Sequence, residues 1–593
     1  MEKFAILLVT LSLGLVALKA QPTIIQQPTN QVLVVGGTMS LNVTASGTGP
    51  LAFQWFKDSR WLLGATNSTL TVTNTTIFQT GIYYVVVTNT PGMVISLPAS
   101  VSVGNPALIA WGDNESGQLG NFSNYYTNMP FTITNGVVTG GVGFRHSLIV
   151  KDDGTLWAMG FNNNGQLGIG LPGNTNILVK VATGVISACG GQFHSLFVKT
   201  NGTLWAMGNN KNGQLGNGVS TITNLTPVSV ASNVVAAATA SFQSFFLTTN
   251  GTLWAMGANS FGQFGNGTIT ATNLVPVSVA SNVVTMAAGR YHTLFVKRNG
   301  TLWATGRNQY GQLGNGTTND TSSPISIASN VLAVAAGEYH SLFVKNDGTL
   351  WSVGRDNYGQ LGNNTTNDIS IPVSVATNLV ALAAGYAHSI FTITNGTIWA
   401  TGFNSVGTLG NGTTINTNVP NNVPNILVAN IFEGLADHCM VIGINYNAGI
   451  SLAGLIRAYT GNAIIPTATT TPLGLSVVFT YNGSTTPPTN SGAYTVIATI
   501  NDPNYVGSVT NTLIVALPPQ NFTINTTINN GILSLQLTGT TNYPYILQMA
   551  TNLTPPVNWV SVVTNPADAS GHWIVQVSYL LSTPQRFYRT LSK

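Results

Sequence analysis

The sequence has very little charge and almost no cysteine. Of its 593 residues only 19 are lysine or arginine and 15 are aspartate or glutamate, so the formal net charge is +4. A chain of this size with so small a surplus and no basic tail lacks the electrostatic footprint of a nucleic-acid-binding protein. The two cysteines, Cys189 and Cys439, lie far apart in the chain. They are therefore expected to be small buried apolar residues and not part of a disulfide framework.

Long hydrophobic runs are missing after the N-terminus. Residues 1–20, with Lys3, an apolar run and the small Ala20, are typical of a secretory signal peptide. A retained membrane anchor is the alternative, and it is disfavoured because the run is shorter than the roughly 20 residues that a spanning helix needs. No later segment could span a bilayer. We therefore expect a protein that is secreted or held at the cell surface, without stable membrane insertion.

Sequence patterns of catalysis are also missing. The sequence contains no Gly-x-Ser-x-Gly elbow, no calcium-loop pattern and no obvious paired-carboxylate motif. The recurring Gly-Gln-Leu-Gly lacks the basic residue of a phosphate-binding loop and is interpreted as turn glycine. We therefore expect no catalytic residue, no metal and no cofactor, and a protein that is not an enzyme.

The sequence does contain a long internal repeat. The phrase Gly-Thr-Leu-Trp-Ala-Met-Gly recurs with small changes and is followed by Gly-Gln-Leu-Gly-Asn-Gly. Its closing glycine falls at Gly112, Gly160, Gly208, Gly257, Gly306, Gly354 and Gly402. A second phrase, Gly-x-x-His, recurs in step and ends at His146, His194, His292, His340, His388 and, more loosely, His438. Gln243 stands in the remaining place, so both phrases indicate seven units.

Each unit is predicted to form four antiparallel strands. In the unit that begins after Asn330, we expect strands at 331–336, 341–345, 349–353 and 372–376. Six units carry Asn-Gly or Asp-Gly between the second and third strands, and these dipeptides accept the positive φ angles of a tight hairpin turn. Four-stranded units repeated in this way are the blades of a β-propeller. The sequence therefore predicts a seven-bladed propeller.

The array begins and ends out of phase. Within the predicted propeller, residues 105–445, it opens at 108–112 with a third strand and closes at 438–443 with a second strand. We expect both ends to contribute to one blade, which closes the ring and removes two exposed sheet edges.

The repeated phrases resemble the repeats of the regulator of chromosome condensation family. The resemblance covers roughly residues 107–443 and implies a β-propeller. It does not imply one function, because a propeller can host many activities.

The region before the array, residues 22–104, resembles an immunoglobulin-like sandwich. Trp55 matches its buried tryptophan, and Gly81-Ile-Tyr83 matches its tyrosine corner. Val43 and Val85 stand where the usual cysteines would be. The resemblance therefore implies a domain held together by apolar packing alone.

Two small β modules are expected after the array, so the whole chain is predicted to be all-β. Residues 446–516 resemble the MBG-type modules of bacterial surface and secreted proteins. The phrases that match are Tyr481-Asn-Gly483, Gly492-Ala-Tyr494-Thr-Val496 and Asn501-Asp-Pro-Asn-Tyr505-Val-Gly507. Pro518-Pro519 marks a boundary. Residues 518–593 resemble a β module that ends some bacterial secreted proteins.

The repeated histidines and tryptophans are interpreted as structural. One histidine per blade, spread around a ring, does not converge on a catalytic or metal site. An amide such as Gln243 can replace imidazole as a hydrogen-bonding group but not as a base. We therefore expect the histidines to form hydrogen bonds within or between blades. The tryptophans at one strand position are expected to be core residues that pack between blades. These are Trp157, Trp205, Trp254, Trp303, Trp351 and Trp399.

The variable residues of the repeat are the candidates for partner binding. Strand direction alternates, so the Gly-x-x-His turns and the loops between third and fourth strands must share one face. Arginine and tyrosine, which are over-represented at interaction hot spots, gather there. The candidates are Arg290, Tyr291, Arg307, Tyr310, Glu338, Tyr339, Arg355, Tyr358 and Tyr386. Ordinary loop variation, with tyrosines covering blade edges, is the alternative interpretation.

The leading hypothesis is a secreted or cell-surface, non-enzymatic protein whose propeller binds an extracellular protein or glycan. A second hypothesis is enzyme inhibition, because the secreted bacterial β-lactamase inhibitor is similar to this propeller and uses an aromatic-rich loop face. The guanine-nucleotide exchange of nuclear family members ranks lower, since the signal peptide and near-neutral charge oppose it. A glycan-active enzyme would require convergent acidic residues, which the sequence does not show.

Overall fold

The structure is a computed structural model. It describes residues 19–424, 426–432, 434–445, 448–471, 473–500, 505, 508–516, 521–523, 532–539, 544–578 and 585–592. Nearly all of the predicted signal peptide, most of the Asn501–Gly507 phrase and the Pro518-Pro519 boundary lie outside these residues. The chain divides into two compact units, Met1–Asn445 and Tyr446–Lys593, and each is described by itself.

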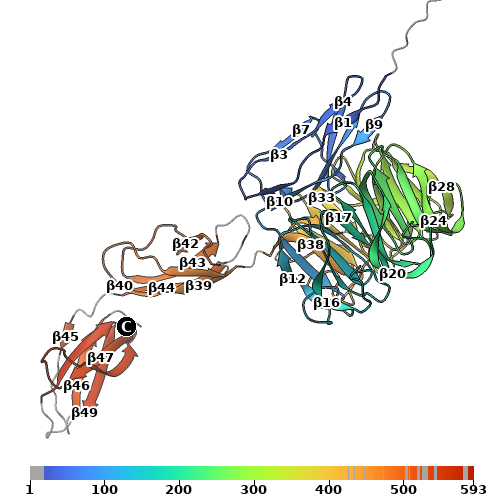
Figure 1. Ribbon diagram of the computed structural model, residues 1–593. Coiled ribbons are helices and arrows are strands. Elements are labelled where there is room, and N and C mark those ends of the chain that lie inside the picture. The colour runs from blue at the N-terminus through green and yellow to red at the C-terminus, as the bar shows by residue number, and fades with distance from the viewer. Residues whose placement is uncertain are drawn as a thin grey trace, which may run out of the picture. The chain divides into compact units, whose positions relative to one another are not determined.

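The N-terminal domain is a β-sandwich (Figure 1). One sheet has the strand order β2-β10-β8-β5-β6, with β9 paired to β8, and β1-β4 and β3-β7 form two-stranded sheets. Its elements are β1 (Thr23–Gln26), β2 (Gln31–Leu33), β3 (Met39–Asn42), β4 (Thr44–Ser46), β5 (Ala52–Lys57), β6 (Arg60–Trp61), β7 (Thr69–Val72), the 3-10 turn η1 (Ile77–Gln79), β8 (Gly81–Thr88), β9 (Met93–Ile95) and β10 (Ala99–Val103).

The core of this sandwich has the residues that the sequence predicts. Trp55 is fully buried, and the Tyr83 hydroxyl donates to the Gln79 carbonyl oxygen at 2.8 Å, which forms the tyrosine corner. Val43 and Val85 are buried in the same apolar cluster. The domain therefore packs valine where related sandwiches have cysteine.

Between Ala107 and Asn445 the described strands form seven four-stranded antiparallel sheets. The first strands of six successive sheets are β13 (Val137–Val142), β17 (Val185–Gly190), β21 (Val234–Thr239), β25 (Val283–Ala288), β29 (Val331–Ala336) and β33 (Leu379–Ala384). The second strands are β14 (His146–Lys151), β18 (His194–Lys199), β22 (Gln243–Thr248), β26 (His292–Lys297), β30 (His340–Lys345) and β34 (His388–Ile393). The third strands are β15 (Leu156–Gly160), β19 (Leu204–Asn210), β23 (Leu253–Asn259), β27 (Leu302–Gly306), β31 (Leu350–Gly354) and β35 (Ile398–Gly402). The fourth strands are β16 (Thr175–Ala182), β20 (Thr221–Ala231), β24 (Thr270–Ala280), β28 (Thr321–Ala328), β32 (Ile369–Ala376) and β36 (Thr417–Asn422).

The remaining sheet of the ring is built from both ends of the array, as predicted. Its order is β12-β11-β38-β37. Strands β37 (Ile426–Ile431) and β38 (His438–Asn445) come from the C-terminal end, and β11 (Ala107–Gly112) and β12 (Thr127–Asn135) from the N-terminal end. The two ends meet where β11 pairs with β38 in antiparallel register. No edge of this sheet is left unpaired at the junction.

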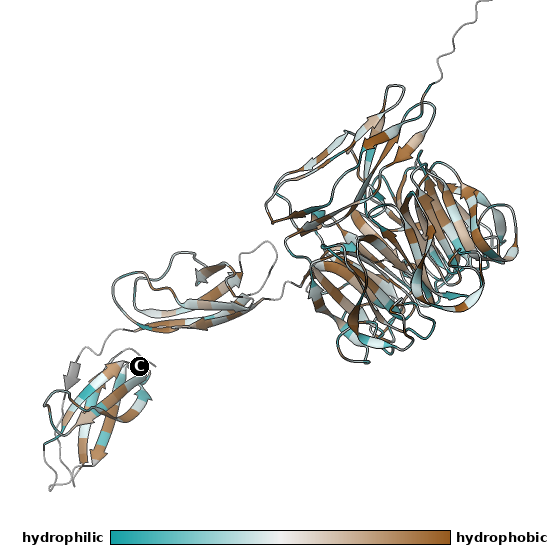
Figure 2. Cartoon of the chain, viewed as in Figure 1, coloured by the Kyte–Doolittle hydropathy of each residue, from teal (hydrophilic) through white to brown (hydrophobic). Residues whose placement is uncertain are grey.

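The strands differ in burial from the axis of the ring to its rim. The first strands of neighbouring blades contact one another, so they lie nearest the axis. Five of the six residues of β30 are buried, whereas β32 at the rim has none that is fully buried. Apolar residues accordingly follow the strands of the blades in Figure 2. Trp111 is fully buried, but all six tryptophans that were expected to be core residues are only partly buried, which departs from that expectation: Trp157, Trp205, Trp254, Trp303, Trp351 and Trp399.

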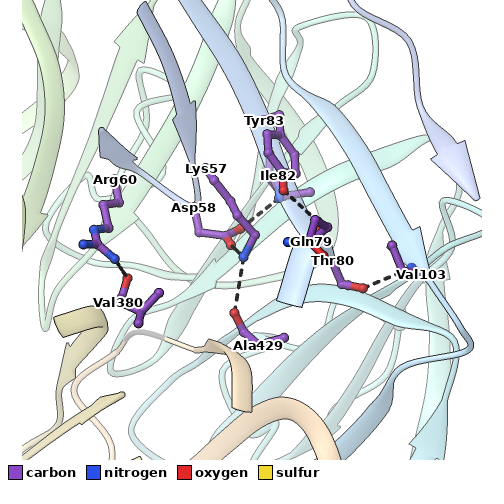
Figure 3. Close-up of polar contacts among 10 residues, drawn as sticks. All are labelled: Lys57, Asp58, Arg60, Gln79, Thr80, Ile82, Tyr83, Val103, Val380 and Ala429. Carbon is purple, nitrogen blue, oxygen red and sulfur yellow. Dashed lines mark hydrogen bonds and ion pairs between the residues drawn. The ribbon is translucent and has the colours of Figure 1, made fainter. Parts of the chain in front are cut away.

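The immunoglobulin-like domain packs against the propeller face that carries the short Asn-Gly turns, called here the short-turn face. Arg60 donates to the carbonyl oxygen of Leu379 at 2.6 Å. It also donates to the carbonyl oxygen of Val380, as Figure 3 shows. The Tyr84 hydroxyl donates to the Val284 carbonyl oxygen at 2.9 Å. Both contacts use backbone carbonyls at the beginning of first strands, so the two domains form one compact unit.

The hairpin between β5 and β6 forms the centre of this contact. Asp58 and Ser59 have positive φ angles of 48° and 61°, as a tight two-residue hairpin turn requires. Lys57 bonds the Asp58 carboxylate at 2.8 Å and the Ala429 carbonyl oxygen at 3.2 Å. A cavity of about 460 Å³ between the hairpin and the first strands is lined by both domains, including Ala236. The hairpin therefore covers the axial end of the ring on this side.

The second unit contains two small groups of sheets. In the first, β39 (Gly449–Ala453) pairs with β41 (Thr467–Thr471), and β40 (Ile456–Ala458), β44 (Ser508–Ala516), β43 (Gly492–Ile500) and β42 (Val477–Tyr481) form a sheet in that order. In the second, β45 (Asn521–Thr523), β46 (Ile532–Thr538) and β49 (His572–Ser578) form one sheet. Strands β48 (Val560–Pro566), β47 (Pro544–Ala550) and β50 (Phe587–Ser592) form the other. None of the helices in the described part of the chain has the length and apolar character needed to cross a membrane.

Candidate binding face of the propeller

The Gly-x-x-His turns and the loops between third and fourth strands lie together on the other face of the ring, called here the long-loop face. Backbone hydrogen bonds join the two within a blade: Arg307 N donates to Tyr291 O and Arg355 N to Tyr339 O, each at 2.9 Å. This pairing sets the side chain of each loop residue beside that of a turn residue. The variable residues of the repeat are thereby brought onto one surface.

Each long loop is held in shape by a buried polar side chain. The Asn308 carbonyl oxygen Oδ1 accepts from Leu313 N at 2.9 Å, and its amide donates to Thr317 O at 3.0 Å. In the next blade Asp356 takes the asparagine position and accepts from Leu361 N at 2.9 Å. Burial raises the pKa of this carboxyl to about 6. The loops are therefore fixed internally before any partner binds.

Four aromatic rings form a continuous row across this face. The ring centroids of Phe261 and Tyr291 are 5.0 Å apart, those of Tyr291 and Tyr339 are 6.3 Å apart, and those of Tyr310 and Tyr339 are 5.0 Å apart. All four side chains are partly exposed. Phe261 was not among the sequence-predicted residues. Its signal was present, because it precedes Gly262-Gln263 as Tyr310 precedes Gly311-Gln312.

Three arginines lie over this row, and one of them, Arg290, is 5.2 Å from the Tyr291 centroid and is described with its ion pair below. The Arg307 guanidinium carbon is 4.6 Å from the Phe261 centroid and 5.5 Å from that of Tyr291. The Arg355 guanidinium carbon is 4.8 Å from the Tyr310 centroid. These distances are within the range of cation–π attraction. The four rings, Arg307 and Arg355 are called the arginine–aromatic cluster below.

Arg290, Glu338 and Tyr386 form a second group beside the cluster, in three successive blades. Arg290 forms an ion pair with Glu338, whose side chain is buried. Burial and the neighbouring Glu338 carboxylate raise the pKa of Tyr386 to about 12. The Tyr386 ring also lies 5.8 Å from that of Phe144. Since its charges are paired internally, this group supports the face and offers no free charge.

Tyr358 is the candidate that lies apart from the cluster. Its ring packs edge-on against Phe403, with the centroids 5.3 Å apart, and it is 36% exposed. Eight of the nine predicted residues thus fall into the two groups above. The structure brings these eight together across neighbouring blades.

The repeated histidines link each blade to its neighbour. Each histidine Nε2 is hydrogen-bonded to a serine Oγ, or in one place to a cysteine Sγ, of the next blade. The pairs are His146–Ser195 (2.8 Å), His194–Ser244 (2.8 Å), His292–Ser341 (2.9 Å), His340–Ser389 (3.1 Å), His388–Cys439 (3.2 Å) and His438–Ser147 (2.8 Å). In the remaining place Gln243 donates to the Gly289 carbonyl oxygen at 3.1 Å and to that of Arg290 at 2.9 Å. These seven links pass around the whole ring.

The proton positions in these links follow from their partners. Ser147 donates its hydroxyl proton to the Gln118 carbonyl oxygen at 2.9 Å, so the imidazole Nε2–H of His438 must donate to Ser147 Oγ. The Nδ1 atoms are buried without a hydrogen-bond partner among the described residues. Burial lowers the pKa of these imidazoles, to about 3 for His438. Neutral, separated histidines hold the blades together and are poorly placed for acid–base chemistry.

Cys439 takes the serine position in one of these links. Its Sγ lies 3.4 Å from the Thr408 carbonyl oxygen, to which it donates, and accepts from His388. Cys439 is therefore a hydrogen-bonding residue as well as a buried one, which the sequence-based interpretation missed. Cys189 is only partly buried, so the expectation of a buried cysteine is correct for Cys439 and wrong for Cys189.

The repeated tryptophans are anchored at the blade surface by threonine and lysine. The Trp351 indole donates to Thr349 Oγ1 at 2.8 Å, and Lys345 Nζ lies 4.1 Å from the indole ring. Trp157, Trp205 and Trp303 repeat both contacts. Trp399 repeats the threonine contact, and Trp254 stacks on Phe246 at 6.2 Å. Among the described residues, no three histidine, cysteine, aspartate or glutamate side chains group in a way that could hold a metal ion.

Three family profiles match the chain. That of the RCC1-like domain matches residues 107–443, that of the MBG domain 448–517 and that of the immunoglobulin domain 21–89. These matches confirm the resemblances of the array, of the module after it and of the N-terminal domain to these three families, and the resemblance stated for residues 518–593 stays a prediction. No curated protein matches the chain.

Solved propellers have the same fold. Human WBSCR16 aligns with a TM-score of 0.53 and 21% identity, covering 57% of this chain and 98% of its own. Prp20p from Saccharomyces cerevisiae, described with its binding to Gsp1p and histones, aligns with a TM-score of 0.53 and 21% identity, covering 58% and 92%. At this identity the likeness concerns the fold alone.

Proposed function

The chain belongs to the family of proteins with an RCC1-like domain, and from that premise we propose that it is a non-enzymatic binding protein whose long-loop face holds a protein or glycan partner. The observation that carries the proposal is the arginine–aromatic cluster. Arginine and tyrosine are the residues that most often dominate binding energy at interfaces. Here they are contiguous and partly exposed.

The rigidity of the cluster supports the proposal. Tyr339 is in contact with Tyr291, Tyr310, Arg307 and Arg355, so its rotamer is restricted before a partner arrives. Ordering one long side chain on binding costs about 0.5–1.5 kcal/mol. A surface that is already ordered avoids much of that cost, and more of the contact energy is available for affinity.

The domain arrangement favours the same face. The immunoglobulin-like domain covers the centre of the short-turn face through Arg60 and Tyr84. The long-loop face does not carry these contacts. A partner that binds the propeller end-on would therefore meet the long-loop face.

We also propose that the protein acts outside the cell or at its surface. The support is the pattern of residues 1–20, with Lys3, an apolar run and Ala20. Inhibition of a secreted enzyme is a narrower form of this function, and the aromatic-rich face favours it as the second candidate. The identity of a captured partner would decide between the two.

The test is a pull-down with the full mature chain from culture medium and surface extracts of neighbouring cells. A Tyr291→Ala/Tyr310→Ala/Tyr339→Ala variant removes the centre of the cluster. An Ile222→Ala/Val275→Ala/Ile371→Ala variant removes exposed apolar residues at the blade rim and serves as the matched control. Near-UV circular dichroism verifies that both variants are folded.

A partner that the parent and the control retain, and the tyrosine variant loses, supports the proposal. Retention by all three proteins would place the binding site elsewhere. Failure of the parent chain to capture any partner from these sources would count against the function itself.

A further inference from the structure

The four arginines of the long-loop face differ in how their charge is balanced. Arg290 is paired with the buried Glu338, and Arg145 is paired with Glu115. Arg307 and Arg355 form no ion pair with any residue in the described part of the chain. Ion pairs that do form in the first unit are Lys57–Asp58, Arg145–Glu115 and Arg290–Glu338. Arg307 and Arg355 are therefore the two arginines of this face without a carboxylate partner among the described residues, and exposed Lys211 in the long loop after β19 also has none.

Acidic residues of the adjoining loops are engaged in holding the loops. The Asp320 carboxylate accepts from Asn308 N at 2.7 Å, and the Asp368 carboxylate accepts from Asp356 N at 2.8 Å. Asp356 is itself buried and bonds Leu361 N. These carboxylates serve backbone amides in the described structure. Arg307 Nη2 donates to Gln309 Oε1, and the remaining guanidinium donors of Arg307 and Arg355 are not paired with a carboxylate among the described residues.

The two free arginines are held close to the same ring. The guanidinium carbon of Arg307 lies 5.8 Å from the Tyr339 centroid, and that of Arg355 lies 5.7 Å from it. Two like charges that share one ring repel each other, and an anion bound between them would remove that repulsion. Contact with the rings restricts each guanidinium group, and its planar fork of N–H donors is the geometry that carboxylates bind.

The rings themselves are poorly suited to stacking a sugar. Tyr291 and Tyr339 are inclined by 36°, and Tyr310 and Tyr339 by 62°, so they do not form a flat platform. Guanidinium groups also lie over them. What the cluster offers is a pair of anion-binding forks bordered by aromatic edges.

We propose that Arg307 and Arg355 together bind carboxylates of an acidic protein segment, with the tyrosine edges packing against its apolar atoms. This inference rests on the proposed function and adds the chemistry of the partner. It predicts that glutamate or aspartate side chains, and not neutral sugars, provide the recognised groups.

The test measures binding of a fluorescein-labelled glutamate-rich peptide to the full mature chain by fluorescence anisotropy. An Arg307→Gln/Arg355→Gln variant removes two charges from the cluster. A Lys180→Gln/Lys211→Gln variant removes the same charge from the fourth strand β16 and from the long loop after β19, two blades that do not contribute to the cluster, and is the matched control. An Arg307→Lys/Arg355→Lys variant keeps the charge but loses the planar forks. The thermal midpoint of each protein verifies folding.

We expect the glutamine variant to lose at least about tenfold in affinity for the peptide, because two charge-assisted hydrogen-bonding groups are removed. The lysine variant should lose less than the glutamine variant, and the control should bind within about twofold of the parent. Binding should weaken as salt increases.

Three results would overturn the inference. Equal losses in the cluster variant and the lysine control would mean unspecific charge attraction. Binding of a uronic-acid oligosaccharide in place of the peptide would mean an acidic glycan. Absence of peptide binding, while the parent still captures a partner through its tyrosines, would reject the acidic segment and leave the proposed function intact. The proposed function fails separately if the pull-down captures no partner.

Discussion

His438 and Ser147 are 291 residues apart in the chain, yet His438 Nε2 lies 2.8 Å from Ser147 Oγ. This bond joins the blade built from both ends of the array to the first continuous blade. The same bond type joins other neighbouring blades, so the closure of the ring uses the device of the repeat itself.

Replacement of Ser147 with alanine should open this link. The change removes the hydroxyl that accepts from His438 Nε2–H and donates to the Gln118 carbonyl oxygen. The loss of these two hydrogen bonds should lower the free energy of unfolding by about 1–3 kcal/mol. Urea denaturation measures this difference. Ser323→Ala, at an exposed rim position, should stay within about 0.5 kcal/mol of the parent. Equal stability of the Ser147 variant and the parent would show that the bond is dispensable.

The glycine of the Gly-x-x-His turn and its histidine should be energetically coupled. A Cβ placed on Gly337 would lie 2.1 Å from His340 Cε1 and 2.7 Å from the Gly385 carbonyl oxygen. Gly337→Ala should therefore destabilise the protein by about 1–3 kcal/mol through overpacking. In the blade where Gln243 replaces histidine, Ala240 replaces the glycine.

A double-mutant cycle tests this coupling. The double variant Gly337→Ala/His340→Gln should lose less free energy of unfolding than the two single variants lose together, by at least about 0.5 kcal/mol. The reason is that glutamine removes the imidazole edge that the new methyl group meets. Strict additivity in urea denaturation would contradict the steric explanation.

Stability should fall as the pH is lowered below about 6.5. Burial lowers the pKa of five ring histidines from 6.5 to about 3, and that of His340 to about 4. The unfolded chain therefore binds protons between pH 6.5 and 3 that the folded chain does not bind. The stability that these histidines contribute is present above pH 6.5 and is lost as the pH falls towards 3.

Two carboxyl groups oppose this trend. The pKa of Asp437 is raised to about 7 by burial and by its neighbours Asp113 and Glu338, and that of Asp356 to about 6 by burial. Near pH 5, unfolding lets six imidazoles take up a proton each, whereas the two carboxyl groups release about one each. The net uptake on unfolding is therefore about four protons. Urea denaturation between pH 7 and 5 measures this uptake, and His292→Gln should reduce it by about one proton. A pH-independent midpoint would contradict the prediction.

Replacement of Arg60 with alanine should loosen the immunoglobulin-like domain from the propeller. The change removes both hydrogen bonds to the carbonyl oxygens of Leu379 and Val380, at a cost of about 1–3 kcal/mol. In scanning calorimetry the domain should then unfold at a lower temperature than the ring. Lys211→Ala, at an exposed loop position, is the control and should leave the thermogram unchanged. An unchanged thermogram for the Arg60 variant would show that other contacts suffice.

The repeat made the propeller predictable from sequence. Expected strands at 331–336 and 341–345 correspond to β29 and β30, because hairpin turns such as Asp347-Gly348 fix the register locally. The pairing of β11 with β38 was also predictable, since an array that starts with a third strand and ends with a second one leaves two strands without partners.

Contacts that occur once in the chain could not be predicted in this way. Arg60 bonds backbone carbonyls, and a carbonyl group has no sequence signature. The position of Phe261 beside Tyr291 depends on how two blades are rotated about the axis, which side-chain identity does not report. The candidate face was therefore predictable as a surface, but its division into a charge-paired group and a free pair of arginines was not.

The closing sheet also determines how the ring would respond to a mechanical load. The chain enters the propeller at Ala107 and leaves it beyond Gly443, and these residues are paired directly opposite each other in the β11–β38 ladder. A force that pulls the flanking segments apart would act on that end of the ladder and break its hydrogen bonds one after another. The other six sheets lie outside this load path. Under such a force the hydrogen bonds between β11 and β38 should therefore break first, while the remaining blades stay folded.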